Sequence, residues 1–152
     1  DQDPHARVTR DIARRLPYGL HLPSFVFFEH QSGLREGSKM SSSRPETAIF
    51  LDDFSKQAEK KILGAFTGGR PTIEEHRRLG GIPEICKVYE LLKFHLPGGK
   101  KLKSIYDDYK SGKMLSSELK QVAIDFFVPW LEKQQEKAAQ KKELAEKIVF
   151  GG

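Results

Sequence analysis

The sequence is poor in the residues that build disulfide-linked or metal-bound folds. It has a single cysteine, Cys86, which excludes a disulfide framework and is typical of a reducing compartment, so we expect a cytoplasmic location. The five histidines stand singly without zinc-ligand spacing, and we therefore expect no protein-bound metal. No apolar run approaches the roughly 20 residues that span a bilayer, so we expect no membrane partner.

The chain also has only a modest excess of positive charge. The net charge is +5 and the pI about 9.3, an excess that favours an anionic partner but is too small to identify one without a local patch. With 38% hydrophobic and 31% charged residues among 152, the chain is long enough for one domain with a modest core. This composition predicts a mainly helical protein.

The most informative stretch is the loop Gly37-Ser38-Lys39-Met40-Ser41-Ser42-Ser43-Arg44-Pro45. Its small residues allow a backbone to approach a ligand closely, and free N–H groups with serine hydroxyls can cradle phosphate oxygens. Lys39 adds a compact positive charge at its centre. Taken alone, the stretch also fits an ordinary serine-rich solvated loop.

Residues 24–29 contain the apolar run Phe25-Val26-Phe27-Phe28. Uninterrupted apolar residues predict a strand that is covered on both faces, as in a parallel α/β sheet. A parallel sheet needs several strands joined by crossover connections, and this chain offers only one. We therefore expect the other strands in sequence that precedes it.

Helical patterns dominate the remainder. Thr9 is the expected N-cap of a first helix, and Asp52 or Asp53 that of a second helix, which should end at Gly68-Gly69. Thr72 and Glu75 have the spacing of a capping box, in which each satisfies a free backbone donor of the other.

The longest helical pattern is the last. Apolar residues from Leu119 to Leu131 recur on one face, which predicts an amphipathic helix. Pro129 interrupts the pattern and should kink the helix near Asp125, whose carbonyl loses its partner.

Several short stretches together resemble a known family. The Lys39 loop is similar to the KMSKS-type loop of class I aminoacyl-tRNA synthetases. The downstream and upstream stretches resemble the tryptophanyl-tRNA synthetases of the archaeal and eukaryotic branch. The quoted stretches are Phe66-Thr67-Gly68-Gly69-Arg70, Thr72-Ile73-Glu74-Glu75-His76-Arg77, Leu79-Gly80-Gly81, Asp1-Gln2-Asp3-Pro4 and Thr9-Arg10-Asp11.

This resemblance implies a fold and a reaction. Residues 51–152 would form a mainly α-helical C-terminal anticodon-binding domain, and residues 1–50 the end of a Rossmann-type α/β catalytic domain with its last strand. The intact enzyme would activate tryptophan with ATP, whose phosphates carry Mg²⁺, and transfer it to tRNA(Trp). Homodimers are expected of the family, and the chain alone should be inactive because the catalytic half is missing.

The resemblance also implies roles for residues of the loop and the N-terminus. Lys39 would stabilise the pyrophosphate that leaves ATP, and Lys39, Met40, Ser41, Ser42 and Ser43 would bind the nucleotide. Where the common motif has a second lysine this chain has Ser42, so that charge is lost although the motif survives. Gln2 would contact the head group of tryptophan.

Candidate RNA contacts lie further along the chain. Arg70, between two expected helices, is by resemblance a candidate for reading the anticodon. The lysines at positions 100, 101, 103 and 113 could follow a phosphate backbone, which gives affinity without sequence information. Each lysine could equally be an ordinary solvated charge.

Two alternatives remain. A tyrosyl-tRNA synthetase shares a Lys-Met-Ser-Ser-Ser loop but lacks the block from Gly68-Gly69-Arg70 to Gly80-Gly81. A helical RNA-binding module without catalysis is the other alternative, and upstream βαβ units with a HIGH-type motif would decide against it.

Overall fold

The computed structural model describes residues 2–150, which fall into two units, the first ending at His30 and the second beginning at Gln31. The loop of residues 31–50 therefore belongs to the same unit as the helices that follow it. The domain boundary expected near residue 50 rests on the resemblance and stays a prediction.

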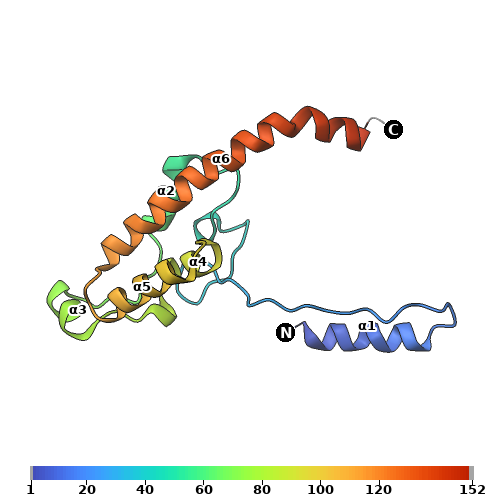
Figure 1. Cartoon of the computed structure of the whole chain (residues 1–152), viewed down its shortest axis with the longest axis horizontal. Helices are drawn as coiled ribbons and strands as arrows, with labels where there is room; N and C mark the ends of the chain where they lie inside the picture. Colours follow the sequence, from blue (N-terminus) through green and yellow to red (C-terminus); the bar gives the residue numbers. More distant parts are fainter. Residues whose placement is uncertain (1, 151–152) are drawn as a thin grey trace. The chain divides into compact units, whose positions relative to one another are not determined.

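The first unit pairs one helix with an extended segment. Helix α1 spans Asp3–Arg15, and the chain then returns beside it (Figure 1). Arg10 Nη1 donates to Pro23 O at 2.7 Å and so ties the two segments together. The expected N-cap at Thr9 is wrong, because the helix begins after Gln2 with Pro4 in its first turn, where a missing N–H costs nothing.

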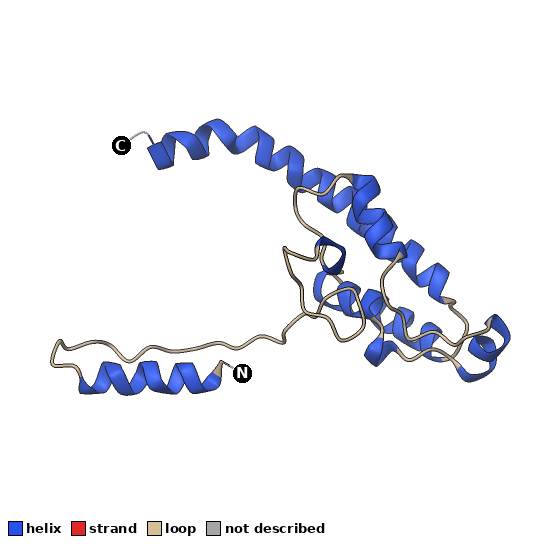
Figure 2. Cartoon of the chain, turned by 180° about the vertical axis from the view of Figure 1, so that it is seen from behind, coloured by secondary structure: helices blue, strands red, loops and turns tan. Residues whose placement is uncertain are grey.

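The strand expected at residues 24–29 does not form. Residues 20–30 are extended, but the described part of the chain contains helices and loops without a strand (Figure 2). A strand is defined by ladder hydrogen bonds to a neighbour, and residues 2–150 supply no neighbouring strand. The apolar side chains of Val26 and Phe28 are accordingly 78% and 87% exposed.

The second unit is helical and is arranged along one long helix. Helix α6, Ser116–Phe150, contacts α2 (Ser55–Leu63), α4 (Lys87–His95) and α5 (Gly99–Lys110). A short helix α3 (Ile73–Leu79) and two 3-10 turns, Pro45–Thr47 and Pro83–Ile85, complete it. The described chain is thus mainly α, as expected.

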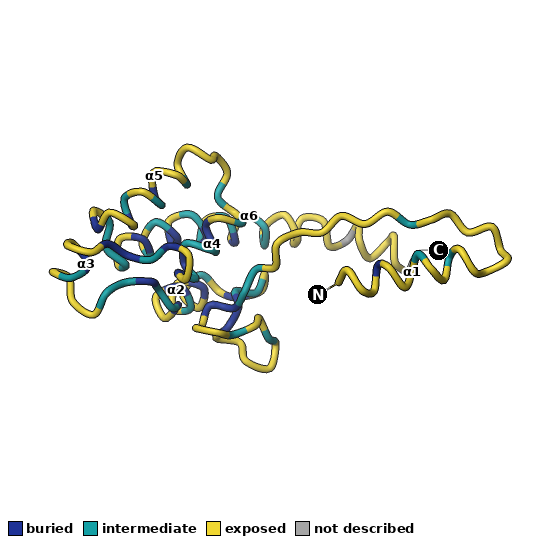
Figure 3. Tube along the Cα trace, turned by 90° about the horizontal axis from the view of Figure 1, so that it is seen from below, coloured by how far each residue is buried: buried dark blue, intermediate teal, exposed yellow. Residues whose placement is uncertain are grey.

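The core follows the apolar face of α6. Leu119, Ala123, Phe127 and Leu131 are buried at four-residue intervals, and residues four apart lie on one helix face. Figure 3 shows the buried stretches of the chain in dark blue. No described residue from 132 to 149 is buried, so the core ends near Leu131. Pro129 lies inside α6, and the kink expected from it stays a prediction.

Glycine is required where α3 meets α5. Thr72 caps α3 by accepting from Glu75 N at 3.1 Å, which confirms one half of the expected capping box; the return bond to the Glu75 side chain does not form between these two described residues. The helix ends at Gly80, whose φ is +71°. A Cβ there would lie 1.8 Å from Lys110 O, so no other residue fits without moving α5.

We expect Gly80→Ala to lower the free energy of unfolding by about 3–5 kcal/mol, because it adds a clash to an unfavourable backbone conformation. Gly37→Ala is the matched control, since Gly37 has a φ of +63° and nothing within 4 Å of an added Cβ. It should cost only about 1–2 kcal/mol. Urea unfolding followed by circular dichroism measures both, and equal losses would contradict the role of the close approach.

Candidate functional site

The loop of residues 31–50 is anchored at its base to the helices. Ser32 donates from N and Oγ to the two carboxylate oxygens of Glu90 on α4, at 2.7 and 2.8 Å. Lys87 Nζ lies 2.9 Å from Glu90 Oε2. Burial alone would raise the pKa of Glu90, but these hydrogen bonds outweigh it and hold that pKa below its usual range.

A second anchor is a buried leucine. Leu34 is 4% exposed; its N–H donates to Thr47 O, and its carbonyl accepts from Phe66 N, both at 2.8 Å. The first bond joins the two ends of the loop, and the second joins the loop to the segment after α2. The loop therefore cannot leave the helical unit at its base without breaking buried hydrogen bonds.

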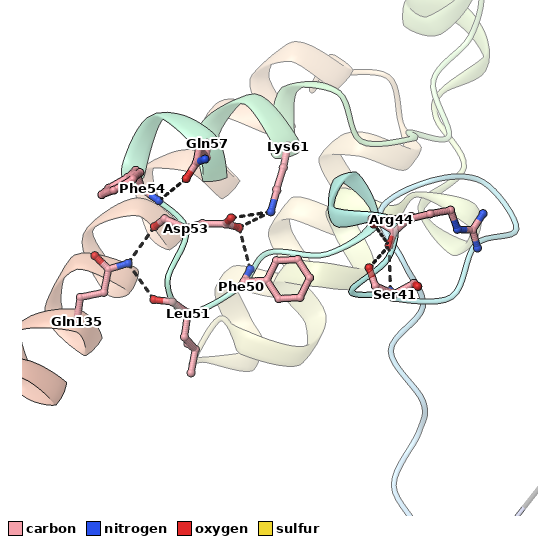
Figure 4. Close-up of polar contacts among 10 residues, drawn as sticks. Ser41, Arg44, Phe50, Leu51, Asp53, Phe54, Gln57, Lys61 and Gln135 are labelled. Carbon is pink, nitrogen blue, oxygen red and sulfur yellow. Dashed lines mark hydrogen bonds and ion pairs between the residues drawn. The ribbon is translucent and has the colours of Figure 1, made fainter. Parts of the chain in front are cut away.

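The C-terminal end of the loop, at Phe50, is held by Asp53 (Figure 4). Its carboxylate accepts from Phe50 N at 2.8 Å and pairs with Lys61 Nζ, with side chains only 10% and 13% exposed. The expectation that Asp52 or Asp53 caps α2 is therefore wrong, because this carboxylate is engaged elsewhere and Phe54 is the N-cap residue. Helix α2 also ends at Leu63, before the expected Gly68-Gly69.

Thr47 organises the interior of the loop. Its side chain is 1% exposed, and its Oγ1 accepts from Ser41 N at 3.0 Å while donating to Arg44 O at 2.7 Å. One buried hydroxyl thus fixes the turn from Ser41 to Arg44. Arg44 N also donates to Ser41 O at 3.2 Å.

The tip of the loop presents cations and hydroxyls to solvent. Lys39 is exposed, and no described residue pairs with its ammonium group. Gly33 allows the tip to fold back, because a Cβ there would lie 2.9 Å from Lys39 O. The hydroxyls of Ser41 and Ser43 lie 2.9 Å apart, and Ser42 is exposed beside them. A free cation next to hydroxyl donors is suited to a polyanion.

The residues expected from sequence to bind ATP all lie in this loop, but they differ in their exposure to solvent. Lys39, Ser42 and Ser43 are exposed and Ser41 is half-buried. Met40 is 46% exposed and also lines an apolar cavity beneath the loop. Gln2, the expected tryptophan contact, lies in the other unit as the N-cap residue of α1, and its side chain makes no cap hydrogen bond.

A second polar surface surrounds Arg70. Arg70 is half-buried, and its Nε donates to Gly80 O at 2.9 Å. It borders an open cavity of about 160 Å³ that Thr72, Ser116 and Ser117 also line. Below it His76 is 3% exposed, and its Nε2 donates to Met114 O at 2.9 Å. The fixed guanidinium and the neighbouring hydroxyls can hydrogen-bond a planar polar group.

The expected RNA-contacting lysines form two groups. Lys100, Lys101 and Lys103 are exposed on the first turns of α5. Lys113 is exposed in the turn after α5, where its carbonyl and that of Gly112 accept from Arg77 Nη1. With a rise of 1.5 Å per residue, α5 separates the two groups by roughly 15 Å. The structure thus places only Lys113 near the end of α5 that contacts Gly80.

Two residues of these sites gave no recognisable signal in the sequence. Thr47 and Arg77 act through side-chain contacts to distant backbone, which no local pattern encodes. Arg44 is a further exposed cation in the loop, and its charge next to the serine run was a signal to which the sequence analysis assigned no role. Among the side chains that the structure describes, which leave out those of residues 143 and 150, no group of three His, Cys, Asp or Glu is placed to hold a metal.

None of the helices in the described range is long and apolar enough to cross a membrane.

Comparisons with known proteins place these features in one family. The family model "tRNA synthetases class I (W and Y)" matches residues 1–132. The tryptophan–tRNA ligase of Methanocaldococcus jannaschii is 48% identical over 99% of this chain and 41% of its own length. That of Aeropyrum pernix is 44% identical over 98% and 41%. The chain therefore spans about two fifths of the length of these relatives.

Solved structures give the same picture. The tryptophanyl-tRNA synthetase of Aeropyrum pernix K1 superposes with a TM-score of 0.90 at 43% identity, over 96% of this chain and 40% of that one. A tyrosyl-tRNA synthetase of the same organism superposes with a TM-score of 0.70 at 20% identity, over 99% and 45%. The latter likeness concerns the fold alone.

Thr47→Val should loosen the loop, because it keeps the shape of the side chain but leaves Ser41 N without an acceptor. We expect it to lower the free energy of unfolding by about 1–3 kcal/mol and to speed proteolytic cleavage within residues 37–45. Thr9→Val is the control, since Thr9 Oγ1 donates to His5 O on an exposed helix face. Unchanged cleavage in Thr47→Val would contradict the role of the hydroxyl.

Proposed function

We propose that this chain serves the ligation of tryptophan to tRNA, because it belongs to the class I tRNA synthetases of the tryptophan and tyrosine group. The observation that carries the proposal is the loop around Lys39. An exposed, unpaired ammonium group stands beside serine hydroxyls, on a base fixed by buried hydrogen bonds.

The reaction needs this kind of group. In the activation step the carboxylate of tryptophan attacks the α-phosphorus of ATP, and the bond to pyrophosphate breaks. Negative charge accumulates on the leaving phosphates, so catalysis consists largely of positioning and electrostatic stabilisation. Lys39 would neutralise that charge while Ser41, Ser42 and Ser43 donate hydrogen bonds. Mg²⁺ would arrive with the nucleotide as part of the substrate.

A tryptophan substrate is favoured over tyrosine by the comparisons. The relatives that are 42–48% identical are tryptophan–tRNA ligases, whereas the tyrosyl enzyme is 20% identical. We propose that Gln2 contacts the head group of tryptophan, since an amide both donates and accepts, as a zwitterion requires. A helical RNA-binding module without catalysis would not need the unpaired Lys39 in its loop.

The helices would bind tRNA, and their two candidate groups would do different work. Arg70 borders a cavity of about 160 Å³ with hydroxyls on its walls, which suits an unstacked base read by its edge. The exposed lysines of α5 and Lys113 would contact phosphates. Base contacts specify and phosphate contacts position, so the two groups can be separated by experiment.

Lys39→Ala, made in an active enzyme that contains these residues, should lower the rate of adenylate formation by roughly 10²-fold or more, the scale for losing one electrostatic stabiliser. The affinity for tryptophan should change much less. Pyrophosphate exchange measures the rate, and Lys56→Ala on the exposed face of α2 is the matched control. An exchange rate equal to that of the wild type would refute the catalytic role of the loop.

For RNA binding, replacing Lys100, Lys101 and Lys103 by alanine should weaken tRNA binding and reduce its salt dependence, by about one unit of slope for each phosphate that the variant no longer neutralises. Arg70→Ala should instead reduce the preference for cognate tRNA and change the slope little. Titrations of cognate and non-cognate tRNA at several salt concentrations measure both effects.

The control for these titrations removes three other exposed lysines, Lys56, Lys60 and Lys133, and so the same charge. Equal weakening by the two triple variants would mean that general basicity, not the α5 lysines, accounts for binding. Because Arg70 Nε also holds Gly80 O, thermal melting must show that Arg70→Ala remains folded at the assay temperature.

A further inference from the structure

An apolar cavity of about 190 Å³ lies directly beneath the loop, within the second unit. Fourteen residues line it: nine from residues 31–51, two from α4 and three from α6. Met40, the neighbour of Lys39, forms part of its wall. The cavity is thus enclosed by the loop on one side and by the helical core on the other.

The walls of the cavity carry no formal charge. None of the lining residues is Asp, Glu, Lys or Arg. His95 is the one titratable group among them, and burial lowers its pKa and so favours its neutral form. A charged ligand would lose its hydration here without gaining a counter-charge. This argument excludes ATP, zwitterionic tryptophan and RNA phosphates as occupants.

Aromatic rings from α4 and α6 form the helical side of the cavity. Phe127 meets Trp130 edge-on with centroids 6.2 Å apart, and His95 meets Phe127 in the same manner at 5.3 Å. Edge-to-face contacts of this kind favour a further ring as a neighbour. An apolar cavity of about 150 Å³ is known to hold benzene. The larger cavity here has room for a ring with one small substituent.

One end of the cavity is polar. His95 Nε2 donates to Gln31 Oε1 at 3.0 Å, which leaves the Gln31 amide group and His95 Nδ1 for other partners. No described residue hydrogen-bonds to His95 Nδ1. A ligand with a single hydroxyl or N–H group would find a partner at this end, while its ring packs against apolar side chains.

We propose that this cavity binds a neutral aromatic molecule that carries one hydrogen-bonding group. Because Met40 belongs to both the cavity wall and the loop, an occupant also restrains the loop beside Lys39. That consequence rests on the function proposed for the loop, whereas binding itself does not.

The chain is well suited to a direct test. Trp130 is its single tryptophan, and it has two methionines, Met40 in the cavity wall and Met114 elsewhere. A chain labelled with 5-fluorotryptophan and methyl-¹³C-methionine therefore gives one fluorine signal and two methyl signals. Benzyl alcohol is the probe. We expect it to shift the signals of Trp130 and Met40 saturably, with one dissociation constant, and to leave Met114 unchanged.

Related probes test the chemistry of the site. Benzylammonium places a charge where benzyl alcohol has its hydroxyl, and we expect it to bind at least tenfold more weakly. Toluene lacks the hydrogen-bonding group and should also bind more weakly. Equal binding of benzylammonium would overturn the proposal, and equal binding of toluene would overturn the assignment of the polar end.

A substitution that fills the cavity with a larger side chain tests the site in the protein itself. Ala48 is 5% exposed in the cavity wall, so Ala48→Leu should weaken binding at least tenfold. Ala139→Leu, on an exposed part of α6, is the matched control and should bind like the wild type. If Ala48→Leu does not fold, the comparison of probes in the unchanged chain decides.

Three outcomes would overturn the proposal: no saturable shift up to the solubility of benzyl alcohol, a parallel shift of Met114, or displacement of benzyl alcohol by ATP or tryptophan. The last result would assign the cavity to the substrate site. Binding of benzyl alcohol with normal catalysis by Lys39→Ala would support the cavity and refute the loop's function, so the two failures are distinguishable.

Discussion

The apolar face of α6 is the constraint on which the second unit depends. Leu119, Ala123, Phe127 and Leu131 repeat every four residues and are each no more than 4% exposed. Helices α2, α4 and α5 all contact this helix. Truncating one such buried leucine or phenylalanine to alanine typically costs about 2–5 kcal/mol, so the relative positions of these helices are strongly determined. No single hydrogen bond of the loop has comparable weight.

The loop takes its geometry from that helical frame. Glu90 on α4, Phe66 after α2 and Lys61 on α2 each hold one point of its base. Between these points Thr47 fixes the turn, whereas Lys39 has no partner among the described residues. This is the arrangement expected where a charged group must meet a ligand while its base stays fixed, since ordering the base in advance reduces the entropy lost on binding. The tip of the loop, in contrast, is exposed to solvent.

Features that depend on neighbouring residues were predictable from the sequence, and features that depend on distant ones were not. Thr72 caps α3 because its partner, Glu75 N, is three residues away. The strand at residues 24–29 was wrong because a strand needs partners that no local pattern guarantees. Asp53 resembles a helix cap in sequence, but its carboxylate pairs with Lys61 and accepts from Phe50 N instead.

The same division applies to the candidate site. The composition of residues 37–45 indicated an anion-binding loop and thus identified Lys39 and its serines. It could not reveal Thr47, because a threonine before an apolar run has many uses. The cavity was equally invisible, since its walls come from residues as far apart as Gln31 and Leu131. Only packing brings such residues together.

Two kinds of chemistry therefore meet in adjacent residues of one loop. Lys39 is exposed, suited to an anion, and absent from the lining of the cavity, whereas Met40 contributes to an uncharged wall. Two ion pairs near the base, Lys61 with Asp53 and Lys87 with Glu90, neutralise their own charges, and none of these four residues lines the cavity. Since Lys39 and Met40 share a peptide bond, a ligand that restrains the backbone at Met40 also restrains the backbone at Lys39.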